Sequence, residues 1–108
     1  MSNTLKPESA LVYLNGAFLP LDEAKVPVLD RGFLFGDGVY EVIPVYGGHP
    51  LRLEEHLQRL EKSLRAIHIE PPLKAQEWTP ILDHLIQGKK EDQQIYIQIT
   101  RGPQAKSC

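Results

Sequence analysis

His56 and Arg59 are the two residues whose types and spacing most clearly suggest chemistry. They stand three positions apart in a segment with helical periodicity, so at about 100° per residue both lie on one flank of that helix, beside its apolar stripe. An arginine at the border of a core can offer its fixed fork of N–H donors to a phosphate or carboxylate. It can also pack its stem on apolar surface with its head in water, and the residues alone favour this second interpretation.

Other candidate groups indicate structure more than chemistry. The glycine cluster matches neither the dinucleotide fingerprint nor the phosphate loop, and predicts a turn that feeds a strand; it consists of Gly32, Gly36 and Gly38. The histidines show no metal-ligand spacing, so we expect surface or boundary positions and no metal site; they are His49, His56, His68 and His84. The single cysteine, Cys108, excludes an intramolecular disulfide framework.

Length and composition limit the class of protein. The 108 residues predict one domain or a piece of one, and 42% hydrophobic with 24% charged residues is a globular balance. A net charge of -2 argues against a strongly basic nucleic-acid binder. The first apolar stretch, 10–21, is interrupted by Asn15-Gly16 and Pro20, so we expect no membrane span, no signal peptide and a cytoplasmic protein.

The elements that must position His56 and Arg59 follow an order of strands, helices and a final strand. Asn15-Gly16 predicts a tight hairpin between strands at 11–14 and 17–21. A strand is predicted at 39–46, with Pro44 at an edge or bulge, followed by a turn at Gly47-Gly48 and a short return strand through 50–53. Strict alternation predicts a last, half-buried strand at 94–100.

Two helices separate these strands. An apolar stripe with spacings of three and four predicts a helix from Glu54 that Pro71-Pro72 stops; the stripe is Leu53, Leu57, Leu60, Leu64 and Ile67. A second helix covers 75–87, with Thr79-Pro80 either as its start or as a kink within it. The sum is an α+β fold, an antiparallel sheet with two helices packed on one side.

In order and spacing, four segments resemble the N-terminal part of the class IV pyridoxal-phosphate aminotransferases, and most of all the D-amino-acid (D-alanine) transaminase branch. They are DRGFLFGDGVYEV at 30–42, VYGG at 45–48, LEEHLQRL at 53–60 and IQITRG at 97–102. Branched-chain aminotransferases and aminodeoxychorismate lyases of the same family look less similar around residues 36–41. The resemblance implies a tail at 1–10, the small N-terminal domain of a fold-type IV aminotransferase at 11–102, and a truncated interdomain segment at 103–108.

The resemblance also implies roles for individual residues. Arg59 matches the arginine that binds the cofactor phosphate, Tyr40 a tyrosine that holds the substrate α-carboxylate, and Val42 a residue lining the substrate pocket. Strand parity supports the last two, because Tyr40, Val42 and Pro44 project from one face. A basic residue is usual in the D-alanine transaminases where Pro44 stands. Lys106 and Cys108 stand where the family has an arginine and a histidine, so the carboxylate trap departs from the pattern.

The family's Schiff-base lysine has no counterpart among the seven lysines of this chain, so we expect the catalytic C-terminal domain to be absent and the chain to be inactive alone. The full-length protein is expected to be a homodimer that binds pyridoxal 5'-phosphate and moves an amino group from an amino acid to a 2-oxo acid. An aminodeoxychorismate lyase, a branched-chain aminotransferase and a non-catalytic truncated interaction module remain as alternatives. The residues do not fix the preferred amino acid or its stereochemistry.

Overall fold

A three-stranded antiparallel sheet is the centre of the computed structural model, which describes residues 10–103. Its order is β4 (His49–Pro50), β3 (Gly38–Tyr46) and β5 (Gln93–Thr100). β3 pairs with β5 along nearly its whole length, from Gly38 opposite Thr100 to Val45 opposite Gln93, whereas β4 reaches only the last two residues of β3. Within the described part of the chain, the first seven residues of β3, 38–44, therefore have a paired strand on one side only.

Pro44 lies on this outer edge, as predicted. Its carbonyl oxygen accepts a hydrogen bond from the backbone N–H of Leu51 at 2.8 Å, on the β4 side. The nitrogen and carbonyl of one strand residue point to the same edge, so the ring nitrogen of Pro44 points away from β5. No hydrogen bond of the β3–β5 ladder is lost to the missing N–H.

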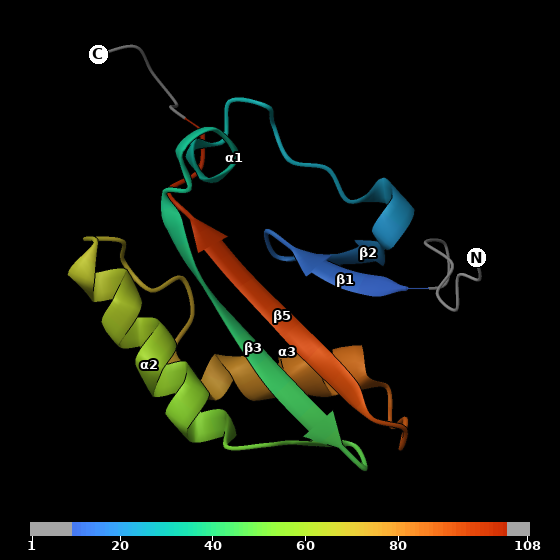
Figure 1. Cartoon of the computed structure of the whole chain (residues 1–108). Coiled ribbons are helices and arrows are strands. Elements are labelled where there is room, and N and C mark those ends of the chain that lie inside the picture. The colour runs from blue at the N-terminus through green and yellow to red at the C-terminus, as the bar shows by residue number, and fades with distance from the viewer. Residues whose placement is uncertain (1–9, 104–108) are drawn as a thin grey trace.

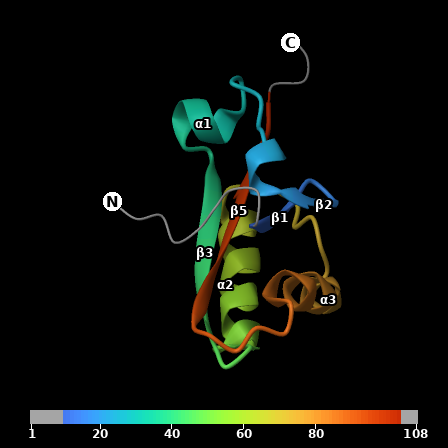
Figure 2. The same cartoon turned by 90° about the vertical axis from the view of Figure 1, so that its right-hand side faces the viewer.

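Helices α2 (Leu53–Ala66) and α3 (Ala75–Ile86) lie on one side of the β3–β5 ladder (Figures 1 and 2). The core between the helices and the sheet confirms the leucine stripe and the isoleucine alternation; its buried members are Ile43, Val45, Leu60, Leu64, Leu82, Ile86, Ile95 and Ile97. The expected α+β architecture is therefore confirmed, with both helices on one face.

Helix α3 settles the two interpretations of Thr79-Pro80. The helix begins at Ala75, where the carboxylate of Glu77 accepts a hydrogen bond from the backbone N–H of Lys74 at 2.6 Å. This contact satisfies one of the donors that every helix start leaves without a partner. Pro80 consequently stands inside a helix that began earlier and does not start it.

The N-terminal hairpin forms as predicted but not as part of the main sheet. β1 (Leu11–Leu14) and β2 (Ala17–Pro20) make a separate two-stranded sheet around Asn15 and Gly16, whose φ angles of 50° and 93° are both positive. A short 3-10 helix, η2 (Leu21–Glu23), follows it. The hairpin packs on α3, where the ring of Phe18 lies 4.3 Å from that of His84. The sequence predicted a single sheet, and the structure has two separate ones.

The segment of the glycine cluster begins with a short helix that the sequence did not predict, α1 (Arg31–Phe35); the cluster then feeds a strand as expected, because Gly38 is the first residue of β3. The side chain of Asp30 accepts a hydrogen bond from the backbone N–H of Gly32 at 2.7 Å and begins the helix, and Gly36 ends it at φ 66°. α1 lies over one end of the β3–β5 ladder (Figure 1). No helix among residues 10–103 is long and apolar enough to cross a membrane.

Candidate functional site

Arg59 and His56 meet on the carboxylate of Glu41, which points from β3 toward α2. Arg59 donates from Nε to Oε2 at 2.7 Å and from Nη2 to Oε1 at 2.9 Å. The Nδ1 atom of His56 lies 2.8 Å from Oε1. The common flank predicted for His56 and Arg59 is thus confirmed, and we call these three residues the Glu41 cluster.

Burial in the Glu41 cluster is uneven. The side chain of Glu41 is 5% exposed, whereas that of Arg59 is 67% exposed. The hydrogen bonds from Arg59 hold the pKa of Glu41 below its ordinary value; burial opposes this shift and His56 adds to it. The same contact raises the pKa of Arg59, so its guanidinium stays charged. The cluster therefore presents a fixed positive group at the surface, held by a buried negative one.

Tyr40 and Val42 lie on the opposite face of β3, the face that no described helix covers. Tyr40 is 65% exposed and Val42 is 37% exposed, in line with the predicted alternation. Tyr96 of β5 stands opposite Val42, and its ring centroid lies 5.7 Å from that of Tyr40 in an edge-to-face arrangement. This face offers an apolar surface with one phenol hydroxyl available from each tyrosine.

The two groups of predicted site residues therefore share one strand. Tyr40 and Glu41 are consecutive, so their side chains leave β3 on opposite faces, and Arg59 reaches Glu41 from the helix side. Along this part of β3 the outer edge has no paired strand within residues 10–103. A ligand lying along that edge would have Arg59 on one face of the strand and Tyr40 on the other.

A second polar cluster lies at the start of the same strand. The Oδ2 atom of Asp37 accepts hydrogen bonds from Nε of Arg31 at 2.9 Å and from Nε of Arg101 at 2.8 Å. Arg101 also donates to the carbonyl oxygens of Ile67, at 2.7 Å, and His68. These contacts, here called the Asp37 cluster, join α1, β3, β5 and the end of α2.

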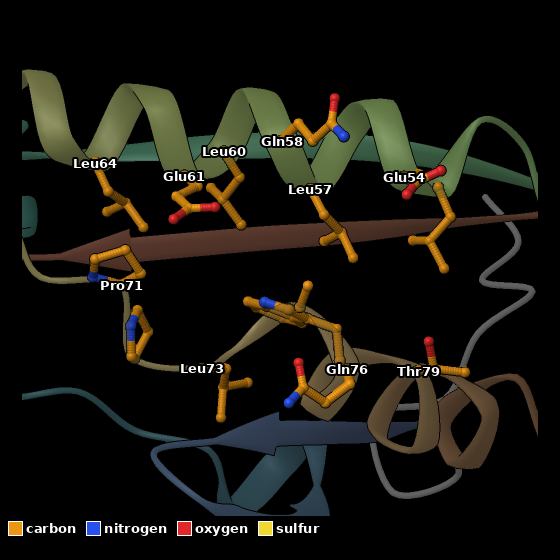
Figure 3. Close-up of a pocket in the computed structure, with 14 residues that line it drawn as sticks. Glu54, Leu57, Gln58, Leu60, Glu61, Leu64, Pro71, Leu73, Gln76 and Thr79 are labelled. Atoms are coloured by element: carbon orange, nitrogen blue, oxygen red, sulfur yellow. The ribbon is translucent and has the colours of Figure 1, made fainter.

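An apolar groove of about 490 Å³ separates α2 from α3 (Figure 3). Leu57, Leu60 and Leu64 of α2 point into it. Trp78 of α3 is also among its lining residues. Neither Arg59, Tyr40 nor Val42 lines this groove. The groove and the candidate site are therefore separate features.

Sequence comparison establishes the family. The family described as amino-transferase class IV matches residues 38–107, well over half of the chain, and the chain belongs to it. The chain is 40% identical over 92 residues to a D-alanine aminotransferase of Bacillus licheniformis. It has the same identity over the same length with a provisionally named branched-chain-amino-acid aminotransferase of Methanocaldococcus jannaschii. Because these two relatives are equally similar, the family is established and the branch is not.

Structure comparison agrees with the family. A hypothetical aminotransferase from Mycobacterium tuberculosis, solved in its PLP-bound form, matches with a TM-score of 0.77 at 25% identity, covering 91% of this chain and 36% of that one. Each of the two sequence relatives is matched over 84% of this chain and 32% of its own length. The chain thus spans about a third of the length of the curated relatives it matches.

Glu41 is the residue that sequence reasoning missed. It lies within the motif at 30–42, and strand parity places it on the same inward face as Ile43 and Val45. An acid on a core-facing position requires a partner, and this was the available signal. Lys106 and Cys108, where the family pattern has an arginine and a histidine, lie outside the described residues.

Proposed function

We propose that this chain is the small N-terminal domain of a pyridoxal-phosphate-dependent aminotransferase that transfers the amino group of a D-amino acid, such as D-alanine, to a 2-oxo acid. The observation that carries the proposal is the exposed guanidinium of Arg59, held at the open edge of β3 with Tyr40 and Val42 on the other face. The planar fork of donors on a fixed, charged guanidinium matches the geometry of a phosphate. Family membership makes the cofactor phosphate the anion of choice.

Each of the three predicted site residues has a separate role in this proposal. Arg59 donates hydrogen bonds to the cofactor phosphate, Tyr40 donates its phenol hydroxyl to the substrate α-carboxylate, and Val42 borders the space for the substrate side chain. Pyridoxal phosphate, when bound, supplies an electron sink that allows the substrate α-carbon to lose its proton. The domain binds and orients; we propose that the lysine for proton transfer belongs to a catalytic domain outside this chain.

The proposed whole protein is a cytoplasmic homodimer. In this proposal the 108-residue chain alone does not catalyse the amino-group transfer. Its seven lysines include none that matches the family's catalytic lysine; they are Lys6, Lys25, Lys62, Lys74, Lys89, Lys90 and Lys106. Reading the gene beyond the codon of Cys108 is the first test. A coding sequence that continues without a cofactor lysine would contradict the proposal.

A branched-chain aminotransferase is the second candidate, favoured by the equal 40% identity to the relative of that description. Pro44 is a second reason to test this alternative, because D-alanine transaminases usually have a basic residue at this position. The full-length protein should be assayed with D-alanine and with L-leucine, each with 2-oxoglutarate as acceptor. A higher kcat/KM for L-leucine would decide for the second candidate.

Replacement of Arg59 tests the site itself. In the full-length protein, Arg59→Ala should weaken retention of pyridoxal phosphate roughly 10- to 100-fold, as expected for the loss of charge-assisted hydrogen bonds. Arg65→Ala is a matched control, because Arg65 is also an exposed arginine of α2 paired with a glutamate, Glu61. Equal retention in both variants would return Arg59 to a packing role.

A further inference from the structure

Glu41 occupies a position where a carboxylate is costly. Its side chain is 5% exposed, and a carboxylate that loses hydration must regain it from hydrogen-bond donors. Arg59 and His56 supply three contacts to its two oxygens. Neither the phosphate contact of Arg59 nor the substrate contacts of Tyr40 and Val42 explains why an acid stands here.

The contact with Arg59 uses only one edge of the guanidinium. Nε and Nη2 face Glu41, at 2.7 and 2.9 Å from its oxygens. A guanidinium carries five N–H groups in one plane, so Nη1 and one N–H of Nη2 point elsewhere. Among the hydrogen bonds of residues 10–103, none uses Nη1 of Arg59, and the side chain is 67% exposed.

Two contacts to one carboxylate fix both the position and the plane of the guanidinium. A free arginine side chain loses rotamer freedom when it binds a ligand, and that loss weakens binding. With Glu41 in place, most of this freedom is lost on folding, before the ligand arrives. His56 restrains the carboxylate in turn, because its Nδ1 lies 2.8 Å from Oε1 and its own side chain is 16% exposed.

We propose that Glu41 is a positioning residue that aims the outer N–H groups of Arg59 at the cofactor phosphate, with His56 holding Glu41 in the required orientation. The inference rests on the proposed function, because it takes Arg59 as the phosphate ligand. Glu41 itself does not touch the cofactor; it acts through Arg59.

Because Glu41 is charged, the proposal can be tested by the direction in which phosphate affinity changes when that charge is removed. Coulomb's law alone makes a carboxylate behind Arg59 repel a phosphate in front of it. Removal of the charge therefore strengthens phosphate binding if charge dominates, and weakens it if orientation dominates. The proposal requires the second outcome.

The experiment compares Glu41→Gln with the unaltered full-length protein containing this domain. Glutamine keeps the size and one acceptor oxygen but loses the charge and the second acceptor. We expect retention of pyridoxal phosphate to weaken about tenfold, and the ³¹P resonance of the bound cofactor to move toward its free position. Glu61→Gln is the matched control, since Glu61 also pairs with an arginine of α2 but both partners are exposed; it should change neither quantity.

A second readout does not depend on the cofactor. In the 108-residue chain, ¹⁵N relaxation of the arginine Nε–H groups should show a marked loss of order at Arg59 in Glu41→Gln, with Arg65 unchanged. If Glu41→Gln does not fold, His56→Ala frees the carboxylate while keeping its pair with Arg59, and should weaken retention about threefold.

The outcomes separate this inference from the proposed function. Unchanged or tighter retention in Glu41→Gln, or in His56→Ala where that variant must stand in for it, overturns the positioning role if Arg59→Ala still releases the cofactor. Unchanged retention in Arg59→Ala overturns the phosphate role of Arg59, and the positioning role with it.

Discussion

The Glu41 and Asp37 clusters lie four residues apart at the same end of β3, and both place one carboxylate between basic side chains. They differ in how the guanidinium nitrogens of their arginines are used. In the Asp37 cluster, Arg101 gives Nε to Asp37 and its two terminal nitrogens to the carbonyl oxygens of Ile67 and His68. In the Glu41 cluster, Arg59 gives one edge to the carboxylate and keeps the other at the surface.

This difference separates a structural ion pair from one suited to a ligand. Arg101 uses all three of its nitrogens to join the ends of α2, β3 and β5, and Arg31 is held to Asp37 through Nε alone, so neither guanidinium is both fixed at two points by the carboxylate and open on its other edge. The buried member of the Glu41 cluster is the acid, and the exposed member is the base. The useful criterion is therefore a guanidinium that a buried acid holds by two contacts while its other edge stays exposed, more than the presence of a salt bridge.

Gly32→Ala should give the largest effect, and should disturb the Asp37 cluster alone. A Cβ at Gly32 would clash with the side chain of Thr100, so α1 could not stay against the end of β5. We expect a loss of about 1–3 kcal/mol in the free energy of unfolding, as for overpacking in a core. Alanine is a better helix former than glycine, so helix propensity predicts the opposite sign. Urea unfolding of the 108-residue chain measures the difference.

The double variant Gly32→Ala with Thr100→Ser is the control for this clash. Serine lacks the Cγ2 methyl group but keeps the hydroxyl that donates to Asp30 at 3.1 Å. Part of the lost stability should return. A double variant no more stable than Gly32→Ala would show that the contact with Thr100 is not the cause.

Asp37→Asn and Glu41→Gln test the comparison directly. Asp37→Asn weakens contacts to Arg31 and Arg101 that join four elements, so its melting temperature should fall by about 5 °C. Its cofactor retention in the full-length protein should stay within about twofold, because Arg59 keeps its partner. Glu41→Gln should show the reverse pattern: its cofactor retention should change more than that of Asp37→Asn. Equal losses of retention in both variants would remove the distinction between the clusters.

Local patterns were sufficient for much of the fold. Asn15-Gly16 specified the first hairpin because both residues tolerate positive φ, and the leucine spacing specified α2 because it can be buried only as a helix face. The helix at the glycine cluster was not predicted because α1 has only five residues, too few to show a period. Asp30 before it was the available helix signal.

The candidate site was predictable only up to the flank of α2. Periodicity placed His56 and Arg59 together, and parity placed Tyr40 and Val42 together, because both rules act within one element. The contact of Glu41 with Arg59 joins residues 18 positions apart, and that of Asp37 with Arg101 spans 64. Such contacts depend on how α2 and β5 pack against β3, which no local period encodes.

The smallest expected effect is the loss of stability at acid pH, and it distinguishes the two clusters most selectively. Hydrogen bonds from arginines lower the pKa of Asp37 and of Glu41 from ordinary values of 3.8 and 4.5. The unfolded chain therefore takes up protons at a higher pH than the folded chain, and stability falls with pH. The contribution of each carboxylate is complete above its ordinary value and is lost as the pH falls through its lower folded pKa.

Melting temperatures of the 108-residue chain between about pH 6 and pH 2 should show this loss on the acid side only. Glu41→Gln should flatten the part of the decline that begins near pH 4.5, and Asp37→Asn the part that begins near pH 3.8, because each variant removes one titrating carboxylate. Since glutamine and asparagine do not titrate, each variant should lie closest to the unaltered chain at the lowest pH. Acid profiles parallel to that of the unaltered chain would mean that neither carboxylate is held in its charged form by the arginines, and the contrast between the two clusters would lose its electrostatic basis.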